Sequence, residues 1–254
     1  MESNLEIGFF SLLLSTGLLL IAIFVDYKEK LNLGNDIFIA GVRAVIQLFA
    51  IGYLLKYIIQ VDNFFLTLAM VLFIVFNAGF NAHKRSGGLS NSLFISLVAI
   101  GAGTTLTLGV MIVSGVIDWV PSQIVPITGM IASNAMVAIG LTYQSLNNKF
   151  NDQRQQVLEK LALGATEKQA SMSIIRESVK TGMSPSIDRT KTVGLVSLPG
   201  MMSGLIFAGV NPTAAIRYQV VVMFMLIGVT SIASFIASYL GYKKYYNDRN
   251  QLIL

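Results

Sequence analysis

Two short stretches of this 254-residue chain place methionine, glycine and proline inside long apolar runs. The first is "PITGMIASNAM", which begins at Pro126, and the second is "SLPGMMSGLIFAG", residues 197–209. Methionine thioethers and an amide can contact a soft metal ion transiently, but they form a poor ligand set for tightly bound iron or zinc. The residue types are therefore compatible with a wall along which a solute passes, and they leave open which residues would ligate a metal.

The second stretch supports two interpretations. Pro199 lies in the first turn of the expected helix, where a missing N–H costs least. Small residues then recur with the spacing that lets another helix approach closely, at Gly200, Gly204 and Ala208. The stretch is either a packing helix that uses this small-residue face, or a helix that lines a solute path with Met201 and Met202 as soft wall residues.

Polar side chains inside the apolar runs need partners that lipid does not offer. Asn134 is one helical turn beyond Met130 and shares its face, and Arg43 and Gln47 have the same spacing. Each is either a contact to a neighbouring helix or a pathway group, and Arg43 can also snorkel to the membrane edge. The candidate pathway residues are Arg43, Gln47, Pro126, Met130, Asn134, Met136, Pro199, Met201, Met202 and Gln219.

The composition is that of a membrane protein. Of the residues, 54% are hydrophobic and only 12% are charged, which is about half the charged fraction of a soluble domain. With no cysteine and one histidine, one chain lacks thiolate ligands and a multi-histidine metal site. No Asp or Glu is expected deep in a span, which disfavours an ion-coupled carrier and an intramembrane enzyme.

Seven apolar runs predict an all-α integral membrane protein that forms a single polytopic domain, residues 1–254. The expected spans are 5–25, 37–59, 64–80, 92–117, 124–146, 193–210 and 213–240. Lys and Arg gather in every second loop, including eight between residues 147 and 191. By the preference of positive charge for the cytoplasm, the N-terminus is expected outside and the C-terminus inside, in the inner (cytoplasmic) membrane. No cleaved signal peptide is expected.

Residues 147–190 are predicted to form a cytoplasmic helix–turn–helix against the inner face of the membrane. Gly164 suits a left-handed turn after the first helix. Thr166 and Gln169 have the T-x-x-Q spacing of a capping box for the second helix, which is expected to end near Gly182. The element either couples the chain to a partner or is a generic amphipathic helix pair.

Four segments resemble a known family: "VRAVIQLFAIGYLL", "PITGMIASNAM", "EKLALGAT" and "VGLVSLPGMMSGLIFAGVNPTAAIRYQ". They are similar to the FetB-like permease subunits of the Fet-type iron-export ABC transporters, and the resemblance covers essentially the whole chain. It implies iron as cargo and a homodimer driven by a separate cytoplasmic ATPase, which binds ATP and Mg²⁺. The chain itself contains no P-loop motif. The "LGAT" turn resembles part of the loop that docks on such ATPases, which implies coupling roles for Glu159, Leu161, Leu163, Gly164, Ala165 and Thr166.

The leading hypothesis is therefore a non-enzymatic permease subunit of an ATP-driven exporter of iron or another metal ion. Its expected partners are the ATPase, a second copy and membrane lipid, with no nucleic acid. A channel or uncoupled facilitator for a small solute, and an ABC permease for a non-metal solute, are the alternatives. A membrane enzyme lacks the catalytic groups it would need.

Overall fold

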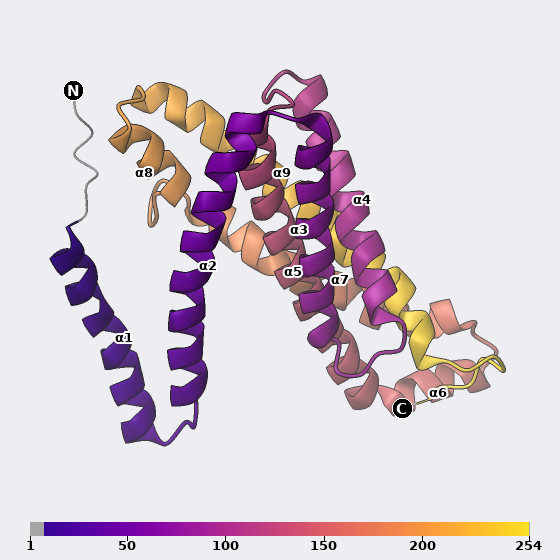
Figure 1. Cartoon of the computed structure of the whole chain (residues 1–254). Coiled ribbons are helices and arrows are strands. Elements are labelled where there is room, and N and C mark those ends of the chain that lie inside the picture. Colours follow the sequence, from indigo (N-terminus) through magenta and orange to yellow (C-terminus); the bar gives the residue numbers. More distant parts are fainter. Residues whose placement is uncertain (1–7, 254) are drawn as a thin grey trace.

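A computed structural model describes residues 8–253 of the chain, which form an assembly of helices (Figure 1). The helices are α1 Phe9–Glu29, α2 Gly34–Val61, α3 Phe64–Lys84, α4 Ser92–Val113, α5 Pro121–Asp152, α6 Arg154–Ala162, α7 Glu167–Thr192, α8 Gly200–Phe207 and α9 Pro212–Gly241, followed by the short 3₁₀ helix η1 Tyr242–Tyr245. The expectation of an all-α membrane protein is confirmed.

Five of the described helices are long and apolar enough to cross a membrane: α2, α3, α4, α5 and α9 with η1. They match the predicted second, third, fourth, fifth and seventh spans, although α5 continues as one helix to Asp152. The predicted first span, 5–25, corresponds to α1, a helix of 21 residues. Residues 5–7 of that span lie outside the described residues.

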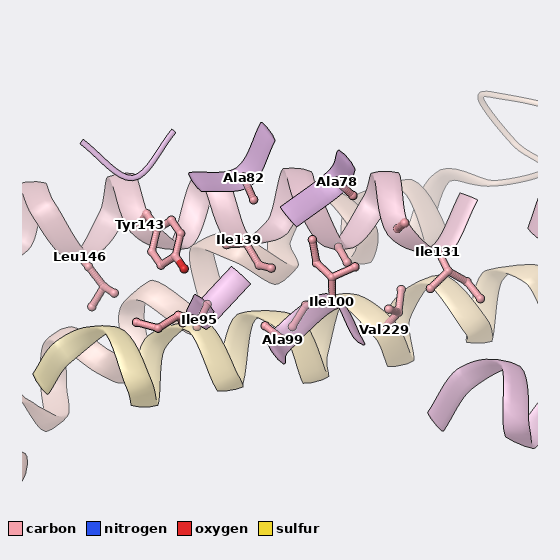
Figure 2. Close-up of a cluster of buried hydrophobic side chains, with 14 of the residues drawn as sticks. Ala78, Ala82, Ile95, Ala99, Ile100, Ile131, Ile139, Tyr143, Leu146 and Val229 are labelled. Atoms are coloured by element: carbon pink, nitrogen blue, oxygen red, sulfur yellow. The ribbon is translucent and has the colours of Figure 1, made fainter. Parts of the chain in front are cut away.

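The core of the bundle is built around α5, which packs against α3, α4, α7 and α9. Ile131, Ile139 and Tyr143 of α5 are fully buried. Figure 2 shows them facing side chains of α4 and α9, and small residues of α3 at Ala78 and Ala82. Small residues let helix backbones approach closely, which is how helices associate in lipid. The central helix is thereby fixed on several sides.

One end of the bundle holds α6, the α3–α4 connection and η1, and we call it the α6 end (Figure 1). Asn147 of α5 ties these pieces together. Its Nδ2 donates to the Ser86 carbonyl at 2.9 Å, and its Oδ1 accepts from the Tyr245 hydroxyl. The Phe150 ring stacks on Tyr245 with centroids 4.1 Å apart. The opposite end, where α8 meets α9, we call the α8 end.

The hairpin of α1 and α2 stands apart from the rest of the bundle (Figure 1). α1 packs on α2, and α2 contacts the bundle at one end, where Ile58 clusters with Met70 of α3 and Val125 of α5. No residue of the most apolar 18-residue window of α2 is buried, and large side chains such as Phe49 and Leu48 are exposed. Such a surface suits contact with lipid or with another membrane protein.

The predicted sixth span, 193–210, is wrong as a continuous helix. Residues 193–199 are irregular, and α8 has only eight residues. Eight residues of α-helix rise about 12 Å, much less than the roughly 30 Å of hydrocarbon in a bilayer. Gly194 and Gly209 adopt φ of 82° and 86°, a left-handed conformation that ends a helix, so the segment is broken on both sides of α8.

The predicted end of the second cytoplasmic helix near Gly182 is also wrong. This helix is α7, and it continues to Thr192 inside the bundle, running antiparallel to α5 and α9. It begins at the α6 end, where Ser171 Oγ lies 2.6 Å from Tyr246 Oη, and it finishes where Thr190 Oγ1 lies 4.0 Å from Met223 Sδ of α9. The second half of α7 and residues 193–211 therefore replace the predicted sixth span as a discontinuous pair of helices.

The passage of α7 between α5 and α9 depends on Gly182. A Cβ added there would lie 2.9 Å from the Ala138 carbonyl oxygen and even closer to the hydroxyls of Thr142 and Ser234. Because one of these neighbours is backbone, we expect Gly182→Ala to lower the free energy of unfolding by about 1–3 kcal/mol. Thermal unfolding of the detergent-solubilised chain, followed by size-exclusion chromatography, measures this loss.

The matched control is Gly228→Ala in α9, where an added Cβ meets nothing within 4 Å. This variant is expected to be at least as stable as the wild type, because alanine has the higher helix propensity. Equal stability of the two variants would contradict the close packing at Gly182.

Candidate functional site

A hollow of about 470 Å³ lies between the end of α7, residues 193–199, α8 and α9, and we call it the α8 pocket. Its lining brings together three residues that the sequence predicted for a pathway: Pro199, Met202 and Gln219. Thr190 and Met223 also line it, and the remaining wall is mostly apolar. A mainly apolar cavity with a few placed polar groups is the usual form of a small-molecule site.

Gln219 is the polar group that the fold leaves unsatisfied in this pocket. The residue is only 6% exposed, and its Oε1 accepts no hydrogen bond. A buried acceptor without a partner costs about 1–3 kcal/mol. Such groups are rare in native proteins and often mark a place where a ligand or water completes the bonding.

Two methionines give the α8 pocket a soft wall. Met202 comes from α8 and Met223 from α9. The Thr190 hydroxyl donates to the Ser186 carbonyl at 2.8 Å. In the part of the chain that the structure describes, no three His, Cys, Asp or Glu residues gather as metal ligands. The pocket therefore suits transient contact with a passing solute.

A second polar contact joins α5 to α7 beside the α8 pocket. Asn134 Nδ2 donates to the Met130 carbonyl at 2.8 Å, and Asn134 Oδ1 accepts from Arg189 Nη1 at 3.2 Å. The sequence predicted a partner or a cavity for Asn134. It missed Arg189, because α7 was expected to end near Gly182, outside the membrane.

By the bounds predicted for the fifth span, 124–146, this contact lies near the middle of the membrane. Asn134 is ten residues beyond Ile124 and twelve before Leu146 on one helix, or about 15 and 18 Å along the axis. Asp188, Arg189 and Lys191 are therefore near mid-depth, and all three are exposed in the single chain. Most of the irregular segment 193–199 is also exposed, and Leu195 is 89% exposed.

Neither charged side chains nor irregular backbone can face lipid at this depth without a large cost. This face must therefore border water or another protein when the chain is in a membrane. The single chain presents one side of a polar surface rather than a closed pathway.

Other predicted pathway residues lie elsewhere. Arg43, Gln47 and Pro126 are exposed, while Met136 and Met201 pack against the hydrophobic core. At Gly200 and Gly204 an added Cβ meets nothing within 4 Å, and Ala208 is exposed. Their face packs on no described part of the same chain, and it stays available to another molecule.

The turn between α6 and α7 has the local structure that the sequence predicted. Gly164 adopts φ of 89°. The Thr166 side chain accepts from the Gln169 N–H at 3.3 Å, while Gln169 Oε1 accepts from the Thr166 N–H at 2.9 Å, which completes the capping box. The turn is therefore well defined although it lies on the surface.

One side chain protrudes from this turn. Leu163 is 88% exposed, whereas Leu161 and Ala165 are half-buried against the core. Glu159 stays on the surface and accepts from Gln155 Nε2 at 3.2 Å. Ten residues further along α7, or about 15 Å, Lys149 hydrogen-bonds Glu177 and lowers the pKa of that carboxyl. A rigid turn that presents one apolar side chain among charged groups is suited to dock on another protein.

Comparison with known proteins places the chain among membrane proteins of one family. Residues 9–246 match the model of the uncharacterised protein family UPF0014, which confirms the resemblance stated from the motifs. The chain is 52% identical over 244 residues to the probable iron export permease protein FetB of Escherichia coli, covering 96% of this chain and 94% of the relative.

More distant relatives also align along most of their length. UPF0014 membrane protein STAR2 of rice (Oryza sativa) is 35% identical, with 97% of this chain and 86% of the relative covered. UPF0014 membrane protein YjkA of Bacillus subtilis is 32% identical, with 96% and 98% covered. No solved structure matches the chain.

Because Gln219 Oε1 is buried without a partner, we expect the chain to become more stable when this amide is replaced. Gln219→Met keeps the length of the side chain and removes the orphan acceptor, so we expect the free energy of unfolding to rise by about 1–3 kcal/mol. Thermal unfolding in detergent measures the gain. Gln156→Met, at an exposed position of α6, is the control and should change stability little. A Gln219→Met variant less stable than the wild type would show that the amide has a partner.

Proposed function

Since the chain belongs to the UPF0014 family, we propose that this multi-pass membrane protein is the permease subunit of an ATP-driven exporter, with iron or another metal ion as cargo. The observation that carries the proposal is the 52% identity to a probable iron export permease along nearly the whole of both chains. ATP and Mg²⁺ would be bound and used by a separate ATPase subunit. This chain would supply the path through the membrane.

The α6–α7 turn is the proposed docking site for that ATPase. Leu163 would enter a groove of the partner, and Gly164 and the capping box would hold the turn in shape. The turn is continuous with α7, whose 26 residues run from Glu167 to Thr192, or about 39 Å. One continuous helix, with Pro185 inside its second half, thus joins the proposed docking site to the α8 pocket. Movement of the turn would shift the wall of the pocket directly.

The α6 end is proposed to face the cytoplasm, in the inner (cytoplasmic) membrane. Lys84, Arg85, Lys149, Lys243 and Lys244 lie there, in or beside the elements that meet at this end. The connections at the opposite end carry Asp62 and Asp118. This asymmetry of basic residues supports a cytoplasmic α6 end.

The active unit is proposed to be a homodimer. The exposed charges at the end of α7 and the irregular segment 193–199 cannot face lipid, so a second copy related by two-fold symmetry would cover them and enclose an aqueous path. The open face at Gly200 and Gly204 would allow close approach of the partner. The pathway would then be built by both copies, with one α8 pocket on each side.

Coupling is tested by Gly164→Val. Valine resists φ of 89°, at a cost of about 1–2 kcal/mol, so the turn should change shape while the membrane helices stay folded. We expect the variant to insert normally, but to lose co-purification of the ATPase and at least about tenfold of ATP-driven metal export in proteoliposomes.

Gly115→Val is the matched control. Gly115 also has positive φ, 70°, and open space around it, but it lies in the α4–α5 connection at the opposite end. It should bear the same local strain and keep export. If Gly164→Val and Gly115→Val both transport like the wild type, a self-contained channel would explain the result better than an ATPase-coupled permease.

The dimer is tested by a single cysteine, because the chain has none. Leu195→Cys places a thiol in the exposed segment 193–199, and oxidation of intact membranes should link two chains through it. Leu72→Cys is the control, because Leu72 is also exposed, at 61%, but lies on α3, which is not part of the proposed interface. Cross-linking at Leu72 and none at Leu195 would place the interface elsewhere.

A further inference from the structure

The charges at the end of α7 do not cancel. Lys191 Nζ lies 3.6 Å from Asp188 Oδ1, and Asp188 also accepts from the Ser184 hydroxyl at 3.1 Å. Arg189 has a neutral partner, because its guanidinium donates to the side-chain oxygen of Asn134. One positive charge per chain therefore remains at mid-depth.

Neither α5 and α9, which pack on α7, nor α3 and α4 behind them supply a carboxylate to neutralise this charge. Along their described lengths α3, α4 and α9 contain no Asp or Glu, and α5 has only Asp152, its last residue at the α6 end. A second copy would bring a second unpaired arginine. The polar surface at the centre of the proposed dimer is thus cationic on both sides.

We propose that the pathway takes its cargo as an anion, in which a metal ion is enclosed by carboxylate or phosphate oxygens, and that Arg189 binds this oxygen shell. This rests on the proposed function, and it names the chemical class of the substrate. A bare metal cation would be repelled by the net positive charge of the surface. The one carboxylate there, Asp188, is already paired with Lys191 and has no thiolate or imidazole beside it. An anionic chelate brings its own ligands and needs only hydrogen-bond donors from the protein.

The side chains around Arg189 suit such a cargo. A guanidinium presents several N–H donors in one plane and can bind a carboxylate or phosphate through two of them. Asn134 occupies one donor and so fixes the orientation of the group. The next residue, Thr190, lines the α8 pocket, where Gln219 Oε1 is free to accept a hydrogen bond from a hydroxyl group or a metal-bound water of the chelate.

The test measures binding to the full-length chain in lipid nanodiscs by equilibrium dialysis, separately with iron(III) citrate and with aqueous Fe²⁺. We expect the wild type to bind iron(III) citrate more tightly than Fe²⁺. Arg189→Gln should weaken citrate-complex binding at least about tenfold, and Arg189→Lys, which keeps the charge, should lose about threefold or less. Arg176→Gln, at an exposed position earlier on α7, is the control and should bind like the wild type.

An anionic chelate and a bare cation predict opposite changes in binding affinity for Arg189→Gln. If the pathway binds bare cations, Arg189→Gln removes a repulsive charge and should bind Fe²⁺ more tightly, with no loss of iron(III) citrate binding. That result would overturn the inference while leaving the exporter function intact. ATP-driven export is measured in parallel, and its absence for every cargo would count against the proposed function, whereas the dialysis result decides the anionic class independently.

Discussion

The close approach of α7 to α5 and α9 at Gly182 is the contact on which the rest of the structure depends. It brings a polar helix into a bundle of apolar ones. Serine and glycine at four-residue spacing, Ser178, Gly182 and Ser186, form the later part of the buried face of α7. That face meets small residues of the neighbouring helices, where helix packing relies on close contact rather than on the hydrophobic effect. Because α7 ends at mid-depth, the α8 pocket and the exposed charges of α7 also lie near the middle of the membrane.

The sequence predicts much of this fold, because long apolar runs signal transmembrane helices directly. α3, α4, α5 and α9 follow from them, and so does the α6–α7 turn, where Gly164 and the Thr166–Gln169 pair have strong local signatures. The depth of α7 could not be predicted from hydropathy, because Arg176, Lys180 and Arg189 give it the composition of a surface helix. The signal that could have found it was the small-residue spacing around Gly182.

The candidate site was predicted only in part, for a related reason. Residues 193–210 have the composition of a span, but two positive-φ glycines divide them, and composition does not show where a helix breaks. Pro199, Met202 and Gln219 were identified and do meet in the α8 pocket. Arg189 and Thr190 come from another part of the chain, and only tertiary structure brings them there. Arg43 and Gln47 share a helical face, yet α2 holds them away from this pocket.

The C-terminal residues also take part in the α6 end. Tyr246 Oη lies 2.6 Å from Ser171 near the start of α7, and the Ile253 N–H donates to the Tyr245 carbonyl at 2.8 Å, so the tail folds back on η1 (Figure 1). An affinity tag or fluorescent protein joined to the chain after this tail would therefore emerge at the α6 end, which also carries the protruding Leu163. Fusions at this terminus would compete for space with anything that docks on the turn, and a tag inserted in the α4–α5 connection at the far end would avoid that conflict.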